Sequence, residues 1–463
     1  RCYSSQYCCP ARASLLMGVH DSHSRSYTQT NGGLVITAEQ QGWSNEELEK
    51  KAARAARIKP SGGEVFLPEL LKKAGYVTGQ FGKLEWGFTT WHGELKRHGW
   101  DRYVGYMDHQ RAHGYYPSFL WKDGERLPLP GNTHADGGKT PEIYGPGATE
   151  KRRGNRDGKV TYAPDAMLAE TLKFMEENRN RPMFILFSTN LPHGPVDIPP
   201  AENKYAGHPA IRQAYAGAAG GNRECAGAAE EYASMVDKLD RQVGAILAQV
   251  HKLGLEKRTI IVFSSDNGHE LYYRTDKERG RGLNCHGGVL DGTGELLDVF
   301  RGSRGLIGQK NAMVNLAGLK WTNHEGGIRV PLIVSWPGTV PHGKVCRSLV
   351  ANYDHMATFA ELAGVGMPEG KDSVSYKNML FGKPSSQRDY VVVDHTVITG
   401  DGWKLTHKQD KWLLFQISSD PEERHNLAET RKDQLERLQA IYRKEAGSPR
   451  KDRQKPEQPR KTA

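Results

Sequence analysis

The chain has 463 residues, enough for two or three domains at roughly 150 residues each. Its 37% hydrophobic and 25% charged residues are ordinary for a protein with a substantial core, and the absence of any apolar run of about 18 residues excludes a predicted membrane span. The formal charge of +10 suits acidic partners, but part of it lies in the Lys- and Arg-rich segment 443–461, so we expect no nucleic-acid partner. The six cysteines form neither a disulfide framework nor a zinc-binding pair, and they leave the compartment undetermined.

A reactive side chain, a helix start and a cation occur together in segment 8–18. Pro10 suits the first position of a helix and good helix formers follow it, so we expect Cys8 just ahead of a helix N-terminus. Free N–H groups there favour anions, and Arg12, one turn further on, adds a forked cation suited to oxyanions. The segment fits either a buried structural cysteine or a nucleophile that faces an anionic substrate.

Apolar periodicity predicts the elements that follow in the chain. In order, these are a helix at 67–74, a strand at 76–82, a surface excursion rich in Gly, Pro, His and Tyr at 106–160, a helix at 165–177, a strand at 183–187, a helix at 232–250, strands at 260–263 and 330–334, and a helix at 355–363. Short runs at 390–393, 403–405 and 412–415 predict a small antiparallel sheet, and 432–445 a last helix.

Uninterrupted apolar strands that alternate with amphipathic helices predict an α/β fold, with a mostly parallel sheet sandwiched by helices. Ligands bind beyond the carboxyl ends of the strands in such sheets. We expect an α/β domain at 1–370, an α+β subdomain at 371–445 and a basic disordered tail at 446–463.

Two polar groups follow predicted strands directly. Asp266 and Asn267 come after strand 260–263, where their oxygens fit a hard cation such as Ca²⁺ or Mg²⁺, although Asp-Asn-Gly is also a common turn. His193 lies between Pro192 and Pro195 after strand 183–187. The prolines hold it rigidly, whereas most single histidines are surface or capping residues.

Two lysines stand in glycine-containing segments. Lys83 follows strand 76–82 between Gly82 and Gly87, and this setting favours a pocket over a solvated charge. Lys320 opens a block that ends at Pro331, in which we expect Glu325 and Arg329 to form a structural ion pair.

These blocks together resemble the signatures of the formylglycine-dependent (type I) sulfatases, arylsulfatase-like. The matching patterns are C-x-P-[S/A]-R-x-x-x-L-x-G at Cys8, G-K-x-H-x-G at Lys83, P-H-x-P at His193, the second metal motif at Asp266, and K-x-x-x-x-E-G-G-x-R-x-P at Lys320. They occur in the order of the family from residue 8 to 331, and segment 403–427 resembles its C-terminal closing segment.

The chain departs from the family pattern at two positions. Met17 replaces the usual Thr, which bears on how the modifying enzyme reads the segment. Glu85 stands where the family has a His, and an ionised carboxylate cannot donate to a sulfate oxygen. Either that role is dispensable, or a histidine of the excursion, such as His109 or His113, substitutes for it.

The resemblance implies an alkaline-phosphatase-like fold and a formylglycine derived from Cys8 by a formylglycine-generating or anaerobic sulfatase-maturating enzyme. It implies Ca²⁺ or Mg²⁺ bound by Asp266, Asn267 and the modified Cys8. It also implies a first strand with two further Asp ligands, upstream of Arg1 in a longer protein, and a periplasmic or extracellular location.

The resemblance also assigns roles at the reacting centre. Arg12 would stabilise the ionised gem-diol that attacks sulfur, and Lys83, His193 and Lys320 would bind the sulfate, one of them protonating the leaving oxygen. The predicted function is a sulfuric ester hydrolase that cleaves aryl or carbohydrate sulfate monoesters, with a sulfated small molecule or glycan as substrate.

Two alternatives stay open. One is a phosphonate monoester or phosphodiester hydrolase that uses the same modified cysteine, and the other is a non-catalytic binder of sulfated glycan. We expect Tyr115, Tyr116 and Trp121 to face solvent and, with the Gly-rich stretch 269–318, to influence the choice of substrate.

Overall fold

The computed structural model describes residues 1–21, 34–55, 64–83, 92–109, 111–133, 158–194, 196–215, 223–270, 316–318, 320–383, 388–408 and 411–446. Residues 271–315 of the Gly-rich stretch 269–318, the segment 84–91 with Glu85, and residues 447–463 of the basic tail 446–463 lie outside these ranges.

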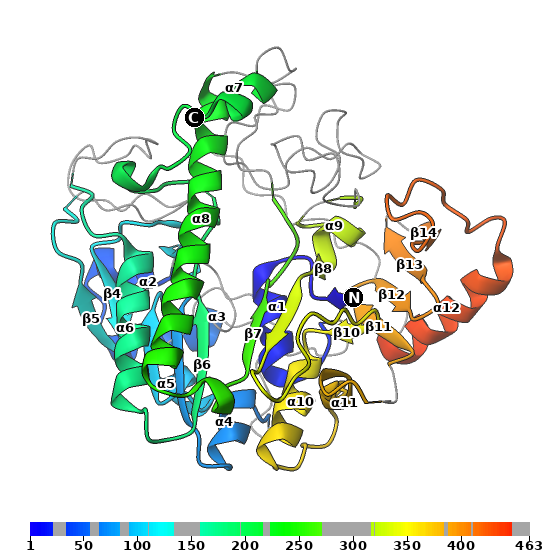
Figure 1. Cartoon of the computed structure of the whole chain (residues 1–463), viewed down its shortest axis with the longest axis horizontal. Coiled ribbons are helices and arrows are strands. Elements are labelled where there is room, and N and C mark those ends of the chain that lie inside the picture. Colours follow the sequence, from blue (N-terminus) through cyan, green and yellow to red (C-terminus); the bar gives the residue numbers. More distant parts are fainter. Residues whose placement is uncertain are drawn as a thin grey trace.

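A five-stranded mixed sheet forms one half of the main body (Figure 1). Its order is β5-β4-β3-β2-β6, with β2 parallel to both β3 and β6, and β4 antiparallel to both β3 and β5. The strands are β2 Val77–Gly82, β3 Arg102–Gly105, β4 Phe119–Lys122, β5 Glu125–Pro128 and β6 Met183–Ser188. Because β2 and β6 run in the same direction, the residues that follow each strand emerge at the same edge of the sheet.

Short strands lie on the other side of the body. β1 Cys2–Tyr3 pairs with β10 Val350–Ala351 in parallel and with β8 Arg329–Val330 antiparallel, and β7 Ile261–Ser264 pairs with β9 Leu332–Ser335 antiparallel. These pairings bring the chain start, the segment after β7 and the segment around residue 329 together.

Helices cover both faces of the five-stranded sheet. On one face α6 Ala163–Glu177 packs Phe174 against Phe81 of β2, with ring centroids 5.5 Å apart, and the long α8 Arg223–Lys252 runs beside α6 (Figure 1). On the other face α1 Cys8–Met17, α4 Leu67–Lys72 and α10 Asp354–Ala363 share a buried apolar cluster that includes Leu16 and Met356. This cluster extends to Phe184 and Leu186 of β6.

The remaining helices are short and mostly peripheral. They are α2 Leu34–Gln41, α3 Asn45–Ala55, α5 His92–Arg97, α7 Pro209–Tyr215, α9 Glu325–Ile328 and α11 Lys377–Leu380, with 3₁₀ turns η1 Arg111–His113, η2 Pro200–Glu202 and η3 Glu256–Arg258. None of the helices within the described ranges is both long and apolar enough to cross a membrane.

A four-stranded antiparallel sheet follows, called the C-terminal sheet below (Figure 1). It comprises β11 Tyr390–Val393, β12 Thr396–Thr399, β13 Trp403–Lys408 and β14 Lys411–Gln416, and α12 Lys432–Ala446 covers one face. The other face shares a buried cluster with Tyr3, Ile328 and Tyr353 of the main body. The predicted α/β class with a small C-terminal antiparallel sheet is confirmed, and the sheets of the main body are mixed.

Two local predictions need correction. The helix begins at Cys8 itself, with Tyr7 as its N-cap, so the cysteine lies in the first turn rather than ahead of it. Tyr115, Tyr116 and Trp121 are buried, not solvent-facing, because residues 106–109 and 111–133 of the expected surface excursion fold inward against α6 and the sheet. Residues 134–157 of the excursion lie outside the described ranges.

Candidate active site

Cys8 lies at the N-terminus of α1, and a lysine from the central sheet reaches it. Its side chain is buried, and Lys83 Nζ lies 3.3 Å from its Sγ atom. Burial by itself raises the pKa of the Cys8 thiol, but the positive charges of Lys320, Lys83 and Arg12 outweigh it and bring that pKa below its ordinary value. The neighbouring Cys9 differs, because burial raises the pKa of its thiol and its Sγ contacts His109 Nδ1 at 3.4 Å.

The end of β2 positions Lys83. Gly82 has φ +127°, and a Cβ atom there would lie 2.1 Å from the carbonyl oxygen of Ser188, so this position requires glycine. The Lys83 N–H donates to the Ser188 carbonyl at 2.7 Å, and the Ser188 hydroxyl donates to the Lys83 carbonyl at 2.8 Å. Strand pairing between β2 and β6 therefore continues one residue further and fixes the direction of the lysine. Burial lowers the Lys83 pKa from its ordinary value.

Arg12 and Asp266 form the second part of the site. Arg12 Nε and Nη2 lie 3.0 and 2.8 Å from Asp266 Oδ2, one turn along α1 from Cys8. Burial opposes ionisation of Asp266, but Arg12, Lys83 and Lys320 lower its pKa to about 2, so it is a carboxylate at neutral pH. The Ser4 hydroxyl donates to the Asp266 carbonyl at 2.6 Å and anchors the end of β7 beside β1.

Lys320 and His193 form a third pair. Lys320 Nζ lies 2.9 Å from His193 Nε2, and His193 Nδ1 lies 2.5 Å from the Gly194 carbonyl. A carbonyl only accepts hydrogen bonds, so Nδ1 carries the proton and Nε2 offers its lone pair to the ammonium. Tyr115 Oη lies 2.5 Å from the His193 carbonyl oxygen and 3.0 Å from the Asn190 carbonyl oxygen, so its one proton is shared between them and holds this loop in place.

The segment around Lys320 lies against both α1 and the end of β7. The Trp321 N–H donates to the Gln6 carbonyl at 2.8 Å, and the Trp321 ring stacks on Tyr7 at 4.6 Å. The Lys320 N–H donates to the His269 carbonyl at 2.8 Å. These backbone contacts bring Lys320 to the start of the helix that carries Cys8.

Two buried histidines of segment 106–133 lie beside Lys83 and Cys9. His113 Nε2 lies 3.5 Å from Lys83 Nζ, and its ring stacks on that of His193 with centroids 4.2 Å apart and an interplanar angle of 10°. His109 meets His113 edge-on at 4.9 Å. The sequence left His109 and His113 as equal candidates; the structure brings His113 to Lys83 and His109 to Cys9.

Glu325 has a second partner that the sequence did not reveal. Arg329 lies 3.7 Å from it, as expected, but Lys404 Nζ of β13 lies 3.2 Å from Glu325 Oε1 and 2.8 Å from Glu423 Oε1. Lys404, Glu325 and Glu423 are all buried. His324 Nδ1 also contacts Glu423 at 3.1 Å, so the C-terminal sheet is tied to the segment of Lys320 by a buried charge network.

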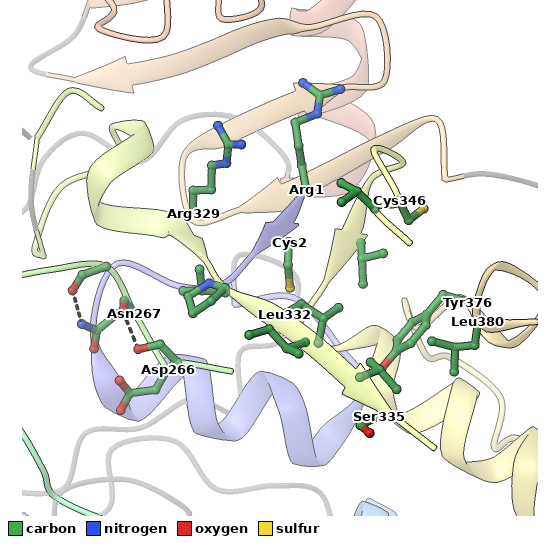
Figure 2. A pocket seen from close by; sticks show the side chains of 18 of the residues that line it. Arg1, Cys2, Asp266, Asn267, Arg329, Leu332, Ser335, Cys346, Tyr376 and Leu380 are labelled. Carbon is green, nitrogen blue, oxygen red and sulfur yellow. Dashed lines mark hydrogen bonds between the residues drawn. The ribbon is translucent and has the colours of Figure 1, made fainter. Parts of the chain in front are cut away.

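A cavity of about 2120 Å³ opens over these groups. Arg12, Lys83, His193, Lys320 and Asp266 line it in part, and it continues toward the chain start. Figure 2 shows Asp266 and Asn267 at one end of the cavity, beside α1, with Tyr376 and Leu380 at the other. Residues predicted from separate motifs therefore line one cavity, and the buried Cys8 lies directly behind Lys83, 3.3 Å from its Nζ atom.

The oxygens beside α1 are suitable donors for a hard cation. Asp266 is ionised, and Asn267 Oδ1 is buried and accepts no hydrogen bond from the described residues, while Asn267 Nδ2 donates to the Gly268 carbonyl at 2.8 Å. A carboxylate and an amide oxygen fit Ca²⁺ or Mg²⁺, and they account for part of the six to eight oxygens that Ca²⁺ usually takes.

Comparison with known proteins gives the family. The Sulfatase family matches residues 1–365, and the family "N-sulphoglucosamine sulphohydrolase, C-terminal" matches residues 320–446. The chain belongs to the sulfatase family. N-acetylgalactosamine-6-sulfatase of Canis lupus familiaris is 26% identical to it over 310 residues. The matched region covers 66% of this chain and 46% of the relative. The chain thus spans about half the length of the curated relatives it matches.

Solved structures share the fold. A Bacteroides thetaiotaomicron structure reported with the metabolism of multiple glycosaminoglycans has a TM-score of 0.63 at 19% identity, covering 96% of this chain and 90% of that chain. BT4656 in complex with its substrate D-glucosamine-2-N,6-O-disulfate has a TM-score of 0.55 at 17% identity, with the same coverage of 96% and 90%. The expected sulfatase fold is confirmed over nearly the whole sulfatase-family chain.

Proposed function

We propose that the protein hydrolyses sulfate monoesters and that an oxidised Cys8 provides the nucleophilic centre. The observation that carries this proposal is the contact between Lys83 Nζ and Cys8 Sγ at 3.3 Å, at a helix N-terminus that Arg12 and Lys320 also make cationic. A sulfate monoester is an anion that resists attack by other anions. Fixed cations around a buried nucleophile bind the anionic ester and stabilise the charge that develops on its oxygens during the attack.

Residues around Cys8 have distinct tasks in this proposal. Lys83 and Lys320 bind the sulfuryl oxygens. The Lys83 ammonium also contacts His113 Nε2, and the Lys320 ammonium contacts His193 Nε2. His193, with its proton on Nδ1, accepts a hydrogen bond from Lys320 and orients it, and Lys320 is then placed to give a proton to the leaving alcohol oxygen. Formylglycine formed from Cys8 would supply an aldehyde that hydrates to a gem-diol, whose second hydroxyl allows sulfate to be released.

Asp266 and Asn267, together with the modified Cys8 side chain, would hold the divalent cation. Such an ion supplies charge that favours an ionised hydroxyl on a neighbouring ligand. Asp266 remains ionised through its pairing with Arg12, and the same pairing keeps the guanidinium beside the first turn of α1.

We further propose that the substrate is a sulfated carbohydrate. Two comparisons support this choice. One relative is an N-acetylgalactosamine-6-sulfatase, and the structural neighbour BT4656 was solved with its substrate D-glucosamine-2-N,6-O-disulfate. A panel of sulfated saccharides tested on the full-length protein, with aryl sulfates for comparison, identifies the preferred class.

Cys8 and Cys9 form a matched pair for the decisive experiment, since both are buried in the first turn of α1 and only Cys8 meets Lys83. We expect Cys8→Ala in the full-length protein, coexpressed with a maturating enzyme, to lose all measurable turnover of 4-nitrophenyl sulfate. Cys9→Ala should keep most of it. Mass spectrometry of the Cys8 peptide should detect the aldehyde.

Full activity of Cys8→Ala rules out this mechanism. Faster turnover of a phosphonate ester than of the matching sulfate ester points instead to a phosphonate or phosphodiester hydrolase. Sulfated-glycan binding with an unmodified Cys8 thiol and no turnover identifies a binder.

A further inference from the structure

The Lys83 side chain lies between two acceptors that come from distant parts of the chain. Its Nζ atom is 3.3 Å from Cys8 Sγ on one side and 3.5 Å from His113 Nε2 on the other. His113 is buried, in the 3₁₀ turn that follows β3. An ammonium has three N–H groups, so these two contacts leave a third for an oxygen of a bound anion.

His113 also contacts His193, the histidine that accepts a hydrogen bond from Lys320. Its ring lies parallel to that of His193 at 4.2 Å, and His193 receives Lys320 through Nε2. The site thus contains two stacked imidazoles, each facing a lysine ammonium through the same ring nitrogen. An ammonium donates only, so the His113 ring must be neutral, with its proton on Nδ1, for this contact to be attractive.

We propose that His113 is a positioning residue of the sulfatase site: its Nε2 lone pair holds the Lys83 ammonium between the nucleophile and the sulfuryl group. This rests on the function proposed above. His113 thereby provides an imidazole beside Lys83 in a chain that has Glu85 where the family pattern has histidine. The contact measures 3.5 Å, and catalytic hydrogen bonds commonly shorten in the substrate complex.

The groups around His113 define what protonation would do. Three residues contact His113 directly: Lys83 after β2, His193 after β6, and His109 from its own segment. The titratable or charged groups that contact these partners, or lie next to those that do, are Lys320, Cys8, Cys9, Arg12 and Asp266. A proton on Nε2 would place a second cation directly against Lys83. Low pH should therefore release Lys83 from its position and reduce turnover.

Three replacements test this in the full-length protein. His113→Ala removes the acceptor and should lower kcat by about tenfold to a hundredfold, the usual effect of losing a residue that orients a ligand group. In His113→Gln the amide oxygen can still accept from Lys83 but cannot be protonated. It should recover much of the lost rate near neutral pH. The acid fall in kcat should be smaller than in the wild type, because only the part caused by protonation of His193 beside Lys320 remains.

Two further histidines serve as comparisons. His109→Gln changes the other candidate from the same segment, and the acid fall in kcat should persist there. His98 is equally buried but stacks on Phe66, with ring centroids 4.0 Å apart, and that ring is not part of the site. His98→Gln therefore measures the general cost of losing a buried ring. If His113→Ala stays within twofold of wild type, or the acid fall in kcat is as large in His113→Gln as in the wild type, the inference is overturned.

A readout without turnover separates this inference from the proposed function. Nitrogen NMR of protein labelled with ¹⁵N-histidine should show His113 as the Nδ1–H tautomer, and its signal should change in Lys83→Met. Finding the Nε2–H tautomer overturns the inference even if the protein is an active sulfatase. A protein without sulfatase activity that shows the Nδ1–H tautomer and the Lys83 dependence retains the contact, and only the proposed function fails.

Discussion

The buried charge network between the C-terminal sheet and the segment of Lys320 makes the sharpest stability prediction. Lys404 on β13 has no exposed surface, and its ammonium lies 3.2 Å from Glu325 and 2.8 Å from Glu423. Lys404→Met keeps a similar length and removes the charge. Two buried carboxylates then face each other without the cation that compensates them.

The size of the effect follows from the contacts that remain. Removing one partner of a buried ion pair costs about 3–5 kcal/mol. Glu423 keeps donors in His324 and the Glu325 N–H, at 3.1 and 2.9 Å, and Glu325 keeps the Tyr3 hydroxyl at 3.0 Å. Because both carboxylates retain hydrogen bonds, we expect a loss of about 3 kcal/mol, at the lower end of that range.

The pH dependence gives a signature of its own. Burial opposes ionisation of Glu423 in the wild type, but Lys404 and His324 lower its pKa to about 2, so its contribution to stability is present above its unfolded pKa and is lost as the pH falls through about 2. Without Lys404, we expect burial to outweigh the remaining contact with His324 and to raise the folded pKa of Glu423 above the unfolded value. Lowering the pH then removes a buried charge, so the deficit of Lys404→Met should shrink between pH 7 and pH 5.

Urea unfolding followed by circular dichroism measures both effects. Lys50→Met is the control, because Lys50 pairs with Glu46 at 2.7 Å on an exposed helix, where such pairs contribute about 0.5 kcal/mol or less. A loss under about 1 kcal/mol for Lys404→Met, well below the range for a broken buried pair, or a deficit that stays constant with pH, would refute this reasoning.

Two further replacements address the metal ligands and the backbone at Lys83. Asp266→Asn should lower the affinity of the full-length protein for Ca²⁺ by at least about tenfold in calorimetry, because the ionised ligand is lost, and unchanged affinity contradicts the assignment. Gly82→Ala should lower the free energy of unfolding by about 1–3 kcal/mol and displace Lys83, because the added Cβ would meet the Ser188 carbonyl. The control is Gly75→Ala, at φ +82° with open space around it, which should lower that free energy by about 1 kcal/mol and leave turnover intact. Equal activity losses at the two glycines would show that the close approach at Gly82 is unimportant.

Much of the fold was predictable where apolar periodicity is long and regular. The helix predicted at 165–177 is α6 Ala163–Glu177, and the strand predicted at 183–187 is β6 Met183–Ser188. Lys83 and His193 follow β2 and β6 of one sheet, and parallel strand ends that share a sheet edge bring side chains together whatever their separation in sequence. Asp266 follows β7 of another sheet, so its approach to them was not predictable in this way. The domain boundary near residue 370 stays a prediction.

Other features depend on contacts that no local pattern encodes. His113 meets Lys83 across 30 residues, and Lys404 meets Glu325 across 79. The aromatic residues at 115 and 116 lie in a Gly- and Pro-rich segment typical of surface loops, yet both are buried against Tyr162. A lone histidine or lysine in such a stretch carries no periodicity, so only the tertiary structure assigns its partner.

The lysines of this protein separate into two kinds by the chemistry of their partners. Lys404 contacts two carboxylates, which cancel its charge, so its role is to join the C-terminal sheet to the segment of Glu325. Lys83 and Lys320 each meet an imidazole nitrogen, at 3.5 and 2.9 Å. A neutral imidazole satisfies one N–H of a buried ammonium without cancelling its charge, so the desolvated lysine keeps its attraction for an anion. Replacing either imidazole by a carboxylate would keep the hydrogen bond but neutralise the pair, which is why two histidines, rather than two acids, suit a cavity that must bind an anionic ester.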